Sequence, residues 1–196
     1  MILYHVKEEI IMLILGSQSP RRKELLESAG LIFNTVKPLF DEDSLPYEGD
    51  PSEYVKELAK AKAHSLVSTY PKDVILTADT IVVVDHEILG KPKDEEDAFR
   101  MLSLLNDKMH TVYTAVCIKY MDKEEVFLEE ADVEFNKMSE LDIRSYIQTG
   151  ESLDKAGAYA IQGIGSKFIK HYEGDFHTIM GLPLKVLLTR LKNYPI

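Results

Sequence analysis

The sequence contains a single cysteine, Cys117, among 196 residues. One cysteine excludes an intramolecular disulfide and a metal cluster held by several thiolates. Because Cys117 lies in an apolar segment, we expect it to fill the core rather than act as a nucleophile. His110 has no second histidine at ligand spacing, so we expect a structural histidine and no zinc site. No apolar run approaches the roughly 18 residues of a membrane-spanning helix, which favours a cytoplasmic protein with no membrane partner.

Basic residues are also scarce, with 23 Lys and Arg against 33 Asp and Glu and a formal net charge of −10. Nonspecific nucleic-acid binding depends on many phosphate contacts by Lys and Arg, so this balance argues against a polynucleotide partner. A small phosphorylated ligand needs only a local cluster of cations. Hydrophobic residues make up 45% of the chain, enough for a buried core, and the sequence leaves a homodimer open.

Two adjacent arginines, Arg21 and Arg22, follow a short loop after a strand predicted over residues 10–15. The serine and proline at 19–20 predict the N-cap and first position of a helix. Positive charge is unfavourable in a first helical turn, so the pair indicates an anion site. We expect both guanidinium groups, free helix N–H groups and the Ser17 hydroxyl to bind phosphate. The alternative is a solvated basic pair.

One carboxylate lies within the most apolar stretch of the chain, residues 74–84. Burying Asp79 among apolar neighbours without a partner would cost free energy, so a task is expected for it. We expect the strand to be interrupted at residues 77–80, which would place Asp79 at a strand end as a proton acceptor or metal ligand, with Thr80 adding a hydroxyl contact. The alternative is a turn aspartate bonded to the backbone.

Four other side chains gain meaning only in combination. Glu42, in an acidic loop, offers a second oxygen ligand beside Asp79 for a divalent cation, Mg²⁺ or Mn²⁺. Lys62, on a predicted helix, and Lys91, in a glycine–lysine–proline loop, offer positive charge to a phosphate. Gln162, in a glycine-rich segment, offers a donor and an acceptor to a base edge. The alternatives are solvent-facing side chains at Glu42 and the lysines, and a structural turn at Gln162.

Strands and helices alternate along the chain, which predicts one α/β protein. Residues 110–119 and 125–137 alternate in polarity and predict a hairpin. We expect residues 1–11 to be a nonessential N-terminal extension and residues 12–196 to form a single domain. Any smaller lobe is expected at about residues 91–150 and would be inserted rather than appended.

Short motifs occur in a fixed order from Met12 onward. They are Ser17-x-Ser19-Pro20-Arg21-Arg22, Asp41-Glu42, Leu58-Ala59-x-x-Lys62-Ala63, Ala78-Asp79-Thr80-Ile81-Val82, Gly90-Lys91-Pro92, His110-x-Val112-x-Thr114, Asp154-Lys155-Ala156-Gly157-Ala158-Tyr159 and Gly181-Leu182-Pro183. This ordered set covers nearly the whole chain and resembles the Maf family of nucleoside triphosphate pyrophosphatases.

The resemblance implies hydrolysis of a nucleoside triphosphate to the monophosphate and pyrophosphate with a divalent metal. It implies a mixed central sheet flanked by helices, in two lobes with a cleft, similar to inosine triphosphate pyrophosphatases. It also implies that Asp79 is the proton acceptor and that Arg22, Thr80 and Gln162 take part in substrate choice. The segment from Asp154 to Gln162 resembles the branch that acts on dTTP and UTP rather than on 7-methyl-GTP. The alternative function is a noncatalytic nucleotide-binding regulator of cell division.

Overall fold

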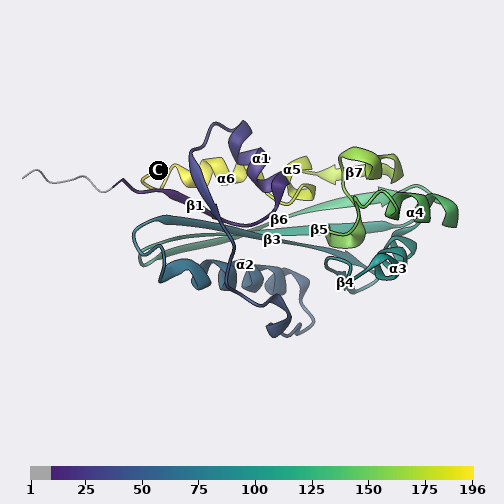
Figure 1. Cartoon of the computed structure of the whole chain (residues 1–196), viewed down its shortest axis with the longest axis horizontal. Helices are drawn as coiled ribbons and strands as arrows, with labels where there is room; N and C mark the ends of the chain where they lie inside the picture. Colours follow the sequence, from purple (N-terminus) through teal and green to yellow (C-terminus); the bar gives the residue numbers. More distant parts are fainter. Residues whose placement is uncertain (1–9) are drawn as a thin grey trace, which may run out of the picture.

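One mixed sheet of seven strands forms the centre of the computed structural model, which describes residues 10–196 (Figure 1). The strands are β1 (Leu13–Gly16), β2 (Phe33–Val36), β3 (Val74–Val84), β4 (Glu87–Leu89), β5 (Met109–Tyr120), β6 (Lys123–Phe135) and β7 (Ile169–Gly174). The α-helices are α1 (Pro20–Ser28), α2 (Pro51–Val67), α3 (Glu95–Leu105), α4 (Glu140–Ile147), α5 (Phe176–Ile179) and α6 (Leu184–Leu191). Three 3₁₀ helices complete the described chain: η1 (Glu42–Ser44), η2 (Ala156–Ala158) and η3 (Gly163–Phe168).

The strand order is β2-β1-β3-β5-β6-β7, with β4 paired to β3. Strand β1 runs parallel to β2 and β3, whereas the other pairs are antiparallel. The predicted hairpin is β5–β6, in which Tyr120 lies opposite Lys123. The structure therefore confirms the expected α/β class with a mixed central sheet.

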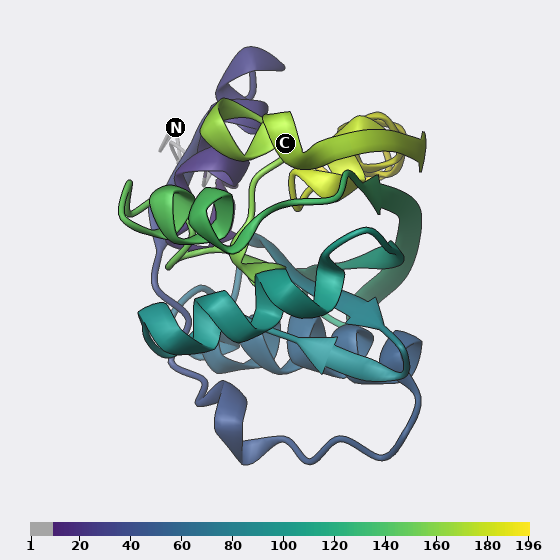
Figure 2. The same cartoon turned by 90° about the vertical axis from the view of Figure 1, so that its right-hand side faces the viewer.

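Helices cover both faces of the sheet, as the two perpendicular views show (Figures 1 and 2). Helix α2 lies on one face, and α1, α5 and α6 lie on the other. Along β3, Ile75 and Ile81 belong to the cluster beneath α2, whereas Leu76 and Val82 belong to the larger cluster on the opposite face. Successive side chains of β3 thus alternate between the two faces, as a strand requires.

The N-termini of the two helices that flank the first strands follow the predicted signals in different ways. Pro20 occupies the first turn of α1 and Ser19 is its N-cap, but the Ser19 side chain makes no capping hydrogen bond. The Ser17 hydroxyl instead accepts the N–H of Ser19 at 3.1 Å. At α2, the Asp50 carboxylate accepts the N–H groups of Ser52 and Glu53, which satisfies donors that the first turn leaves free.

The prediction that β3 is interrupted at residues 77–80 is wrong. The strand continues through them, because β5 pairs with it from Ile75 to Val83 and the polar side chains have partners. Thr77 donates its hydroxyl to the Ala59 carbonyl of α2 at 2.7 Å, and Asp79 contacts a lysine of the same helix. Asp79 therefore lies within a strand and not at its end.

The expected extension of residues 1–11 falls mainly on residues 1–9, which lie outside the described residues. The smaller lobe expected at residues 91–150 stays a prediction, and β5 and β6 from that range belong to the central sheet. Within residues 10–196, no helix combines the length and apolar character needed to cross a membrane.

Candidate active site

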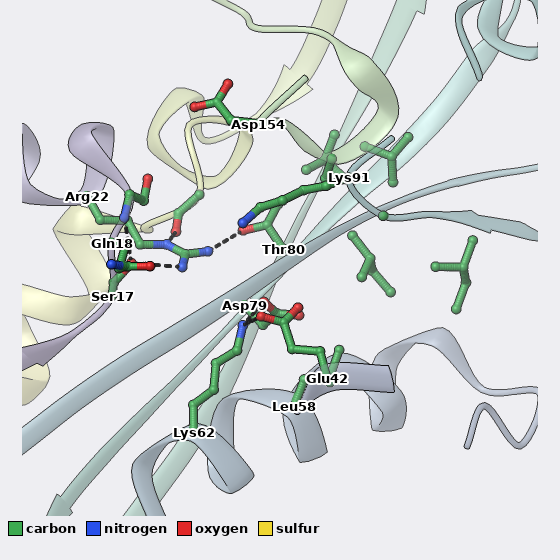
Figure 3. A pocket seen from close by; sticks show the side chains of 18 of the residues that line it. Ser17, Gln18, Arg22, Glu42, Leu58, Lys62, Asp79, Thr80, Lys91 and Asp154 are labelled. Atoms are coloured by element: carbon green, nitrogen blue, oxygen red, sulfur yellow. Dashed lines mark hydrogen bonds and ion pairs between the residues drawn. The ribbon is translucent and has the colours of Figure 1, made fainter. Parts of the chain in front are cut away.

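A cavity of about 950 Å³ opens at the edge of β3 (Figure 3). Strand β5 occupies the other edge of β3, whereas on this edge β1 pairs only as far as Thr77 and the pairing with β4 starts at Val82. Among the described residues, no strand therefore neighbours residues 78–81 on the cavity side. The volume lies within the range of roughly 300–1,000 Å³ that is typical of small-molecule sites.

The main chain at this open edge offers a free donor. The Ala78 carbonyl faces the gap, because it accepts Arg22 Nη1 at 2.8 Å. The main-chain groups of alternate residues face the same edge of a strand, so the N–H of Thr80 also points into the gap. Within residues 10–196 this N–H has no hydrogen-bond partner, which leaves it available to an anion.

Three charged side chains meet on the α2 side of the cavity. Lys62 Nζ lies 2.5 Å from Asp79 Oδ1 and 2.9 Å from Glu42 Oε1. Lys62 and Asp79 are each only 7% exposed, whereas about half of the Glu42 side chain is exposed. Figure 3 shows these three residues on one side of the β3 ribbon. The pairing satisfies a buried carboxylate and a buried ammonium that would each be costly alone.

Lys62 lies on the buried stripe of α2, which explains its position. The other buried residues of this helix are Val55, Leu58, Ala59, Ala63 and Leu66, so Lys62 takes a place that the helical period assigns to the core. Burial alone would raise the pKa of the Glu42 carboxyl, but Lys62, with help from Lys91 and Arg22, lowers it below its usual value. Glu42 is therefore ionised at neutral pH.

Arg22 lies on the other side of β3, and its guanidinium is occupied by protein acceptors. Besides its bond to Ala78, Nε donates to the Gly181 carbonyl at 2.8 Å and Nη2 donates to Thr80 Oγ1 at 3.1 Å. Nη1 also lies 3.4 Å from Ser17 Oγ. Arg22 therefore joins the loop after β1, the middle of β3 and the turn before α6.

Arg21 and Lys91 differ from Arg22 in their hydrogen bonding. Both line the cavity, and within residues 10–196 neither donates a hydrogen bond to the protein. Burial lowers the pKa of Arg21, and the nearby acidic side chains of Asp154 and Glu151 partly offset this effect. The free donors of Arg21 and Lys91 are the ones that can bind an added anion.

The chain is also similar in sequence to a known protein family. The sequence model of the family described as Maf-like protein matches residues 12–194. The chain belongs to the Maf family.

Two relatives of this Maf-like chain are similar over nearly their full length. The dTTP/UTP pyrophosphatase of Acholeplasma laidlawii (strain PG-8A) is 64% identical over 94% of this chain and 97% of the relative. The dTTP/UTP pyrophosphatase of Bacillus cereus (strain ATCC 10987 / NRS 248) is 44% identical over 100% of this chain and 98% of the relative. A dITP/XTP pyrophosphatase structure from Mycobacterium abscessus is 15% identical over 93% of this chain and 97% of that one, with a TM-score of 0.48.

Most residues predicted from the sequence line the cavity of this Maf-like protein. They are Ser17, Arg21, Arg22, Glu42, Lys62, Asp79, Thr80 and Lys91. Gln162 does not: it is exposed, precedes η3 and is absent from the residues that line the cavity. Its contact with a base stays a prediction.

The cavity also has an aromatic wall that the sequence analysis did not identify. Tyr47 and Tyr54 pack edge to face with ring centroids 5.5 Å apart, and both line the cavity. Burial raises the pKa of Tyr54, and the nearby carboxylates of Asp79 and Glu42 add to the rise. Tyr54 lies one turn before Leu58 on α2, so its helical spacing could have placed it on the same face of the helix. Tyr47 lies in a loop, where no such spacing indicates its position.

The two residues expected to be structural are buried. His110 Nε2 lies 2.8 Å from the Tyr159 hydroxyl, and burial lowers the pKa of His110 to about 3. Cys117 packs in the cluster beneath α2, and burial raises the pKa of its thiol to about 12. Both side chains thus lie in the core, as the sequence predicts.

Proposed function

We propose that this protein hydrolyses dTTP and UTP to the nucleoside monophosphate and pyrophosphate. The observation that carries the proposal is the buried Asp79–Lys62 pair at the floor of a nucleotide-sized cavity, with Glu42 beside it. The names of the relatives, dTTP/UTP pyrophosphatases, support both the bond cleaved and the bases. Because its substrates belong to nucleotide metabolism, we also propose that the protein acts in the cytoplasm. The homodimer stays a prediction.

The cationic side chains would bind the triphosphate. Within residues 10–196, Arg21 and Lys91 have free donors, and the unpaired N–H of Thr80 adds a main-chain donor at the open edge of β3. Such preorganised donors stabilise the charge that develops on phosphoryl oxygens in the transition state. Arg22 contributes its positive charge while its donors hold the surrounding loops.

Asp79 would accept the proton of the attacking water. Its Oδ1 atom contacts Lys62, so the second carboxylate oxygen remains free for the water. The water oxygen bonds to the α-phosphorus, the bond from that phosphorus to the bridging oxygen breaks, and pyrophosphate leaves with the bond electrons. The water proton passes to Asp79, and Lys62 holds the carboxylate in place.

A divalent cation, Mg²⁺ or Mn²⁺, fits the two carboxylates. Lys62 Nζ binds one oxygen of Asp79 and one of Glu42 at 2.5 and 2.9 Å, which holds the two carboxylates side by side, and the other oxygen of each would face the cation or its bound water. Within residues 10–196 no group of three or more His, Cys, Asp or Glu side chains could hold a metal. One or two carboxylates completed by substrate phosphates is a usual Mg²⁺ arrangement. When bound, the cation neutralises phosphate charge and orients the substrate.

A noncatalytic nucleotide-binding regulator is less well supported. Such a protein would need cations for the triphosphate but would have no use for a buried carboxylate at the same place. The presence of Asp79 in the cavity therefore favours the enzyme.

The test is a panel of nucleoside triphosphates incubated with purified protein and Mg²⁺ or Mn²⁺, followed by separation of pyrophosphate from orthophosphate. We expect equal amounts of monophosphate and pyrophosphate, with dTTP and UTP as the best substrates. Release of orthophosphate and diphosphate would contradict cleavage at the α-phosphorus, and tight binding without cleavage would favour the regulator.

A further inference from the structure

We propose that Lys62 prevents the divalent cation from binding by itself, so that the protein retains the cation only together with the nucleotide. The proposal rests on the proposed function, because it concerns the cation and the substrate of the same cavity. Lys62 lies between the two carboxylates that fit a cation, with Nζ 2.5 Å from Asp79 Oδ1 and 2.9 Å from Glu42 Oε1. It therefore controls when these carboxylates are available.

The charge of this cluster disfavours a cation that arrives alone. Two carboxylates and one ammonium leave a single net negative charge for an ion with two positive charges. Solvent screens the ammonium weakly, because Lys62 and Asp79 are each only 7% exposed. Lys91 and Arg22 also lie close enough to Glu42 to lower its pKa. A free cation is therefore attracted less strongly than by two unpaired carboxylates.

The ammonium also occupies oxygen atoms that a cation would need. It binds one oxygen of each carboxylate, so within residues 10–196 only one oxygen of Asp79 and one of Glu42 have no donor. Mg²⁺ prefers about six oxygen ligands and loses its bound waters reluctantly. Two oxygens from the protein are too few to replace that hydration shell.

A triphosphate would change both conditions. Its oxygens supply further ligands for the cation, and its negative charge outweighs the positive charge of the ammonium. An ammonium has three N–H donors, and within the described residues Lys62 uses only two of them. Because Lys62 lines the cavity, its third donor is available to a phosphate oxygen. Lys62 thus repels a cation that comes alone and attracts the phosphates that accompany one.

This arrangement couples the binding of the two ligands. If the nucleotide raises the affinity for the cation, the cation raises the affinity for the nucleotide by the same factor. Removing the charge of Lys62 should strengthen binding of the cation alone and therefore reduce that factor.

The first experiment measures the binding of Mn²⁺ alone to the whole protein, from the electron paramagnetic resonance signal of the free ion. Lys62→Met replaces the ammonium with an apolar side chain, and Lys62→Arg is the matched control that retains the charge. We expect Lys62→Met to bind Mn²⁺ about tenfold or more tightly than the wild type, and Lys62→Arg to bind it as weakly as the wild type. Equal dissociation constants for the wild type and Lys62→Met would overturn the proposal. An equal gain in Lys62→Arg would also overturn it, because charge would then not be the cause.

A double variant shows where the added ion binds. When Lys62→Met is combined with Glu42→Gln, one of the two carboxylates is lost, so the gain in Mn²⁺ affinity should disappear. A gain that persists without the Glu42 carboxylate would overturn the proposal, because the ion would then be bound elsewhere.

The second experiment uses the wild-type protein, because Lys62→Met leaves the buried Asp79 carboxylate without its ammonium and need not fold. The probe is UTP whose α and β phosphorus atoms are joined by a methylene group, which prevents cleavage between them. We expect Mn²⁺ alone to leave the midpoint of thermal unfolding nearly unchanged. Mn²⁺ with the analogue should raise the midpoint by about 5 °C or more above the value with the analogue alone. An equal rise with Mn²⁺ alone would overturn the proposal.

Neither experiment depends on turnover. If the wild-type protein releases no pyrophosphate from any nucleotide, the proposed function fails, while the Mn²⁺ measurements still decide the role of Lys62.

Discussion

Arg22 Nε donates to the carbonyl of Gly181 at 2.8 Å, across 159 positions of the chain. The turn at Gly181 depends on glycine, because its φ is +98° and a Cβ there would lie 3.1 Å from Thr80 Oγ1. The two residues hold the loop after β1 against the turn before α6. Arg22 is thus part of the structural frame of the site as well as a source of positive charge.

The first prediction concerns stability. Arg22→Ala removes the donors of two part-buried carbonyls, Ala78 and Gly181, and an unsatisfied buried acceptor costs about 1–3 kcal/mol. For the two acceptors together, we expect the free energy of unfolding to fall by about 2–6 kcal/mol on this scale. Urea denaturation of the unliganded protein measures it. An unchanged denaturation midpoint would contradict this structural role and would favour the alternative that Arg21 and Arg22 are a solvated basic pair.

Arg21 gives the contrasting second prediction. Its guanidinium lines the cavity and, within residues 10–196, donates no hydrogen bond to the protein. Arg21→Ala should therefore leave the unfolding midpoint near that of the wild type. It should weaken triphosphate binding by about 1.5–3 kcal/mol, the scale of a hydrogen bond to a charged group. Calorimetric titration with UTP measures the loss, and affinity equal to that of the wild type would contradict the role.

The contrast between these neighbours shows what the sequence could predict about the site. The strand, tight loop and proline-started helix place both arginines correctly from local signals. Which of the two has free donors depends on Ala78, Thr80 and Gly181, which are 56 to 159 positions away. Local patterns contain no information on such partners.

Asp79 illustrates the same limit in the strand itself. Its chemistry was predictable, because a carboxylate among apolar residues needs a partner. Its place within an unbroken β3 was not, since that depends on Lys62 and on pairing with β5. Gln162 is the converse case: its side chain suits a base, yet the structure leaves it outside the cavity lining.

The third prediction tests Asp79 as the proton acceptor. Asp79→Asn keeps the shape and still offers Lys62 an acceptor oxygen, but it removes the basic carboxylate and one anionic metal ligand. We expect turnover to fall by about 10²-fold or more, with the far-UV circular dichroism spectrum retained. Steady-state release of pyrophosphate from UTP measures it. Turnover near that of the wild type, with metal present, would exclude Asp79 as the acceptor.

The last prediction concerns the pH dependence of stability. Burial lowers the pKa of His110 to about 3 in the folded protein, while an unfolded histidine has a pKa of about 6.5. Below pH ~6.5 the unfolded chain therefore binds a proton that the folded chain does not. His110 thus contributes stability that is fully present above pH ~6.5 and is lost as the pH falls toward 3.

In that range this one group should lower the free energy of unfolding by up to about 1.4 kcal/mol per pH unit. His110→Gln keeps a polar partner for Tyr159 but does not titrate. The free energy of unfolding of this variant should therefore fall less steeply than that of the wild type between about pH 6.5 and about pH 4.5. Urea denaturation at several pH values measures both slopes. His171→Gln, on exposed β7, is the matched control, and equal slopes for the wild type and His110→Gln would show that His110 does not stay neutral in the folded core.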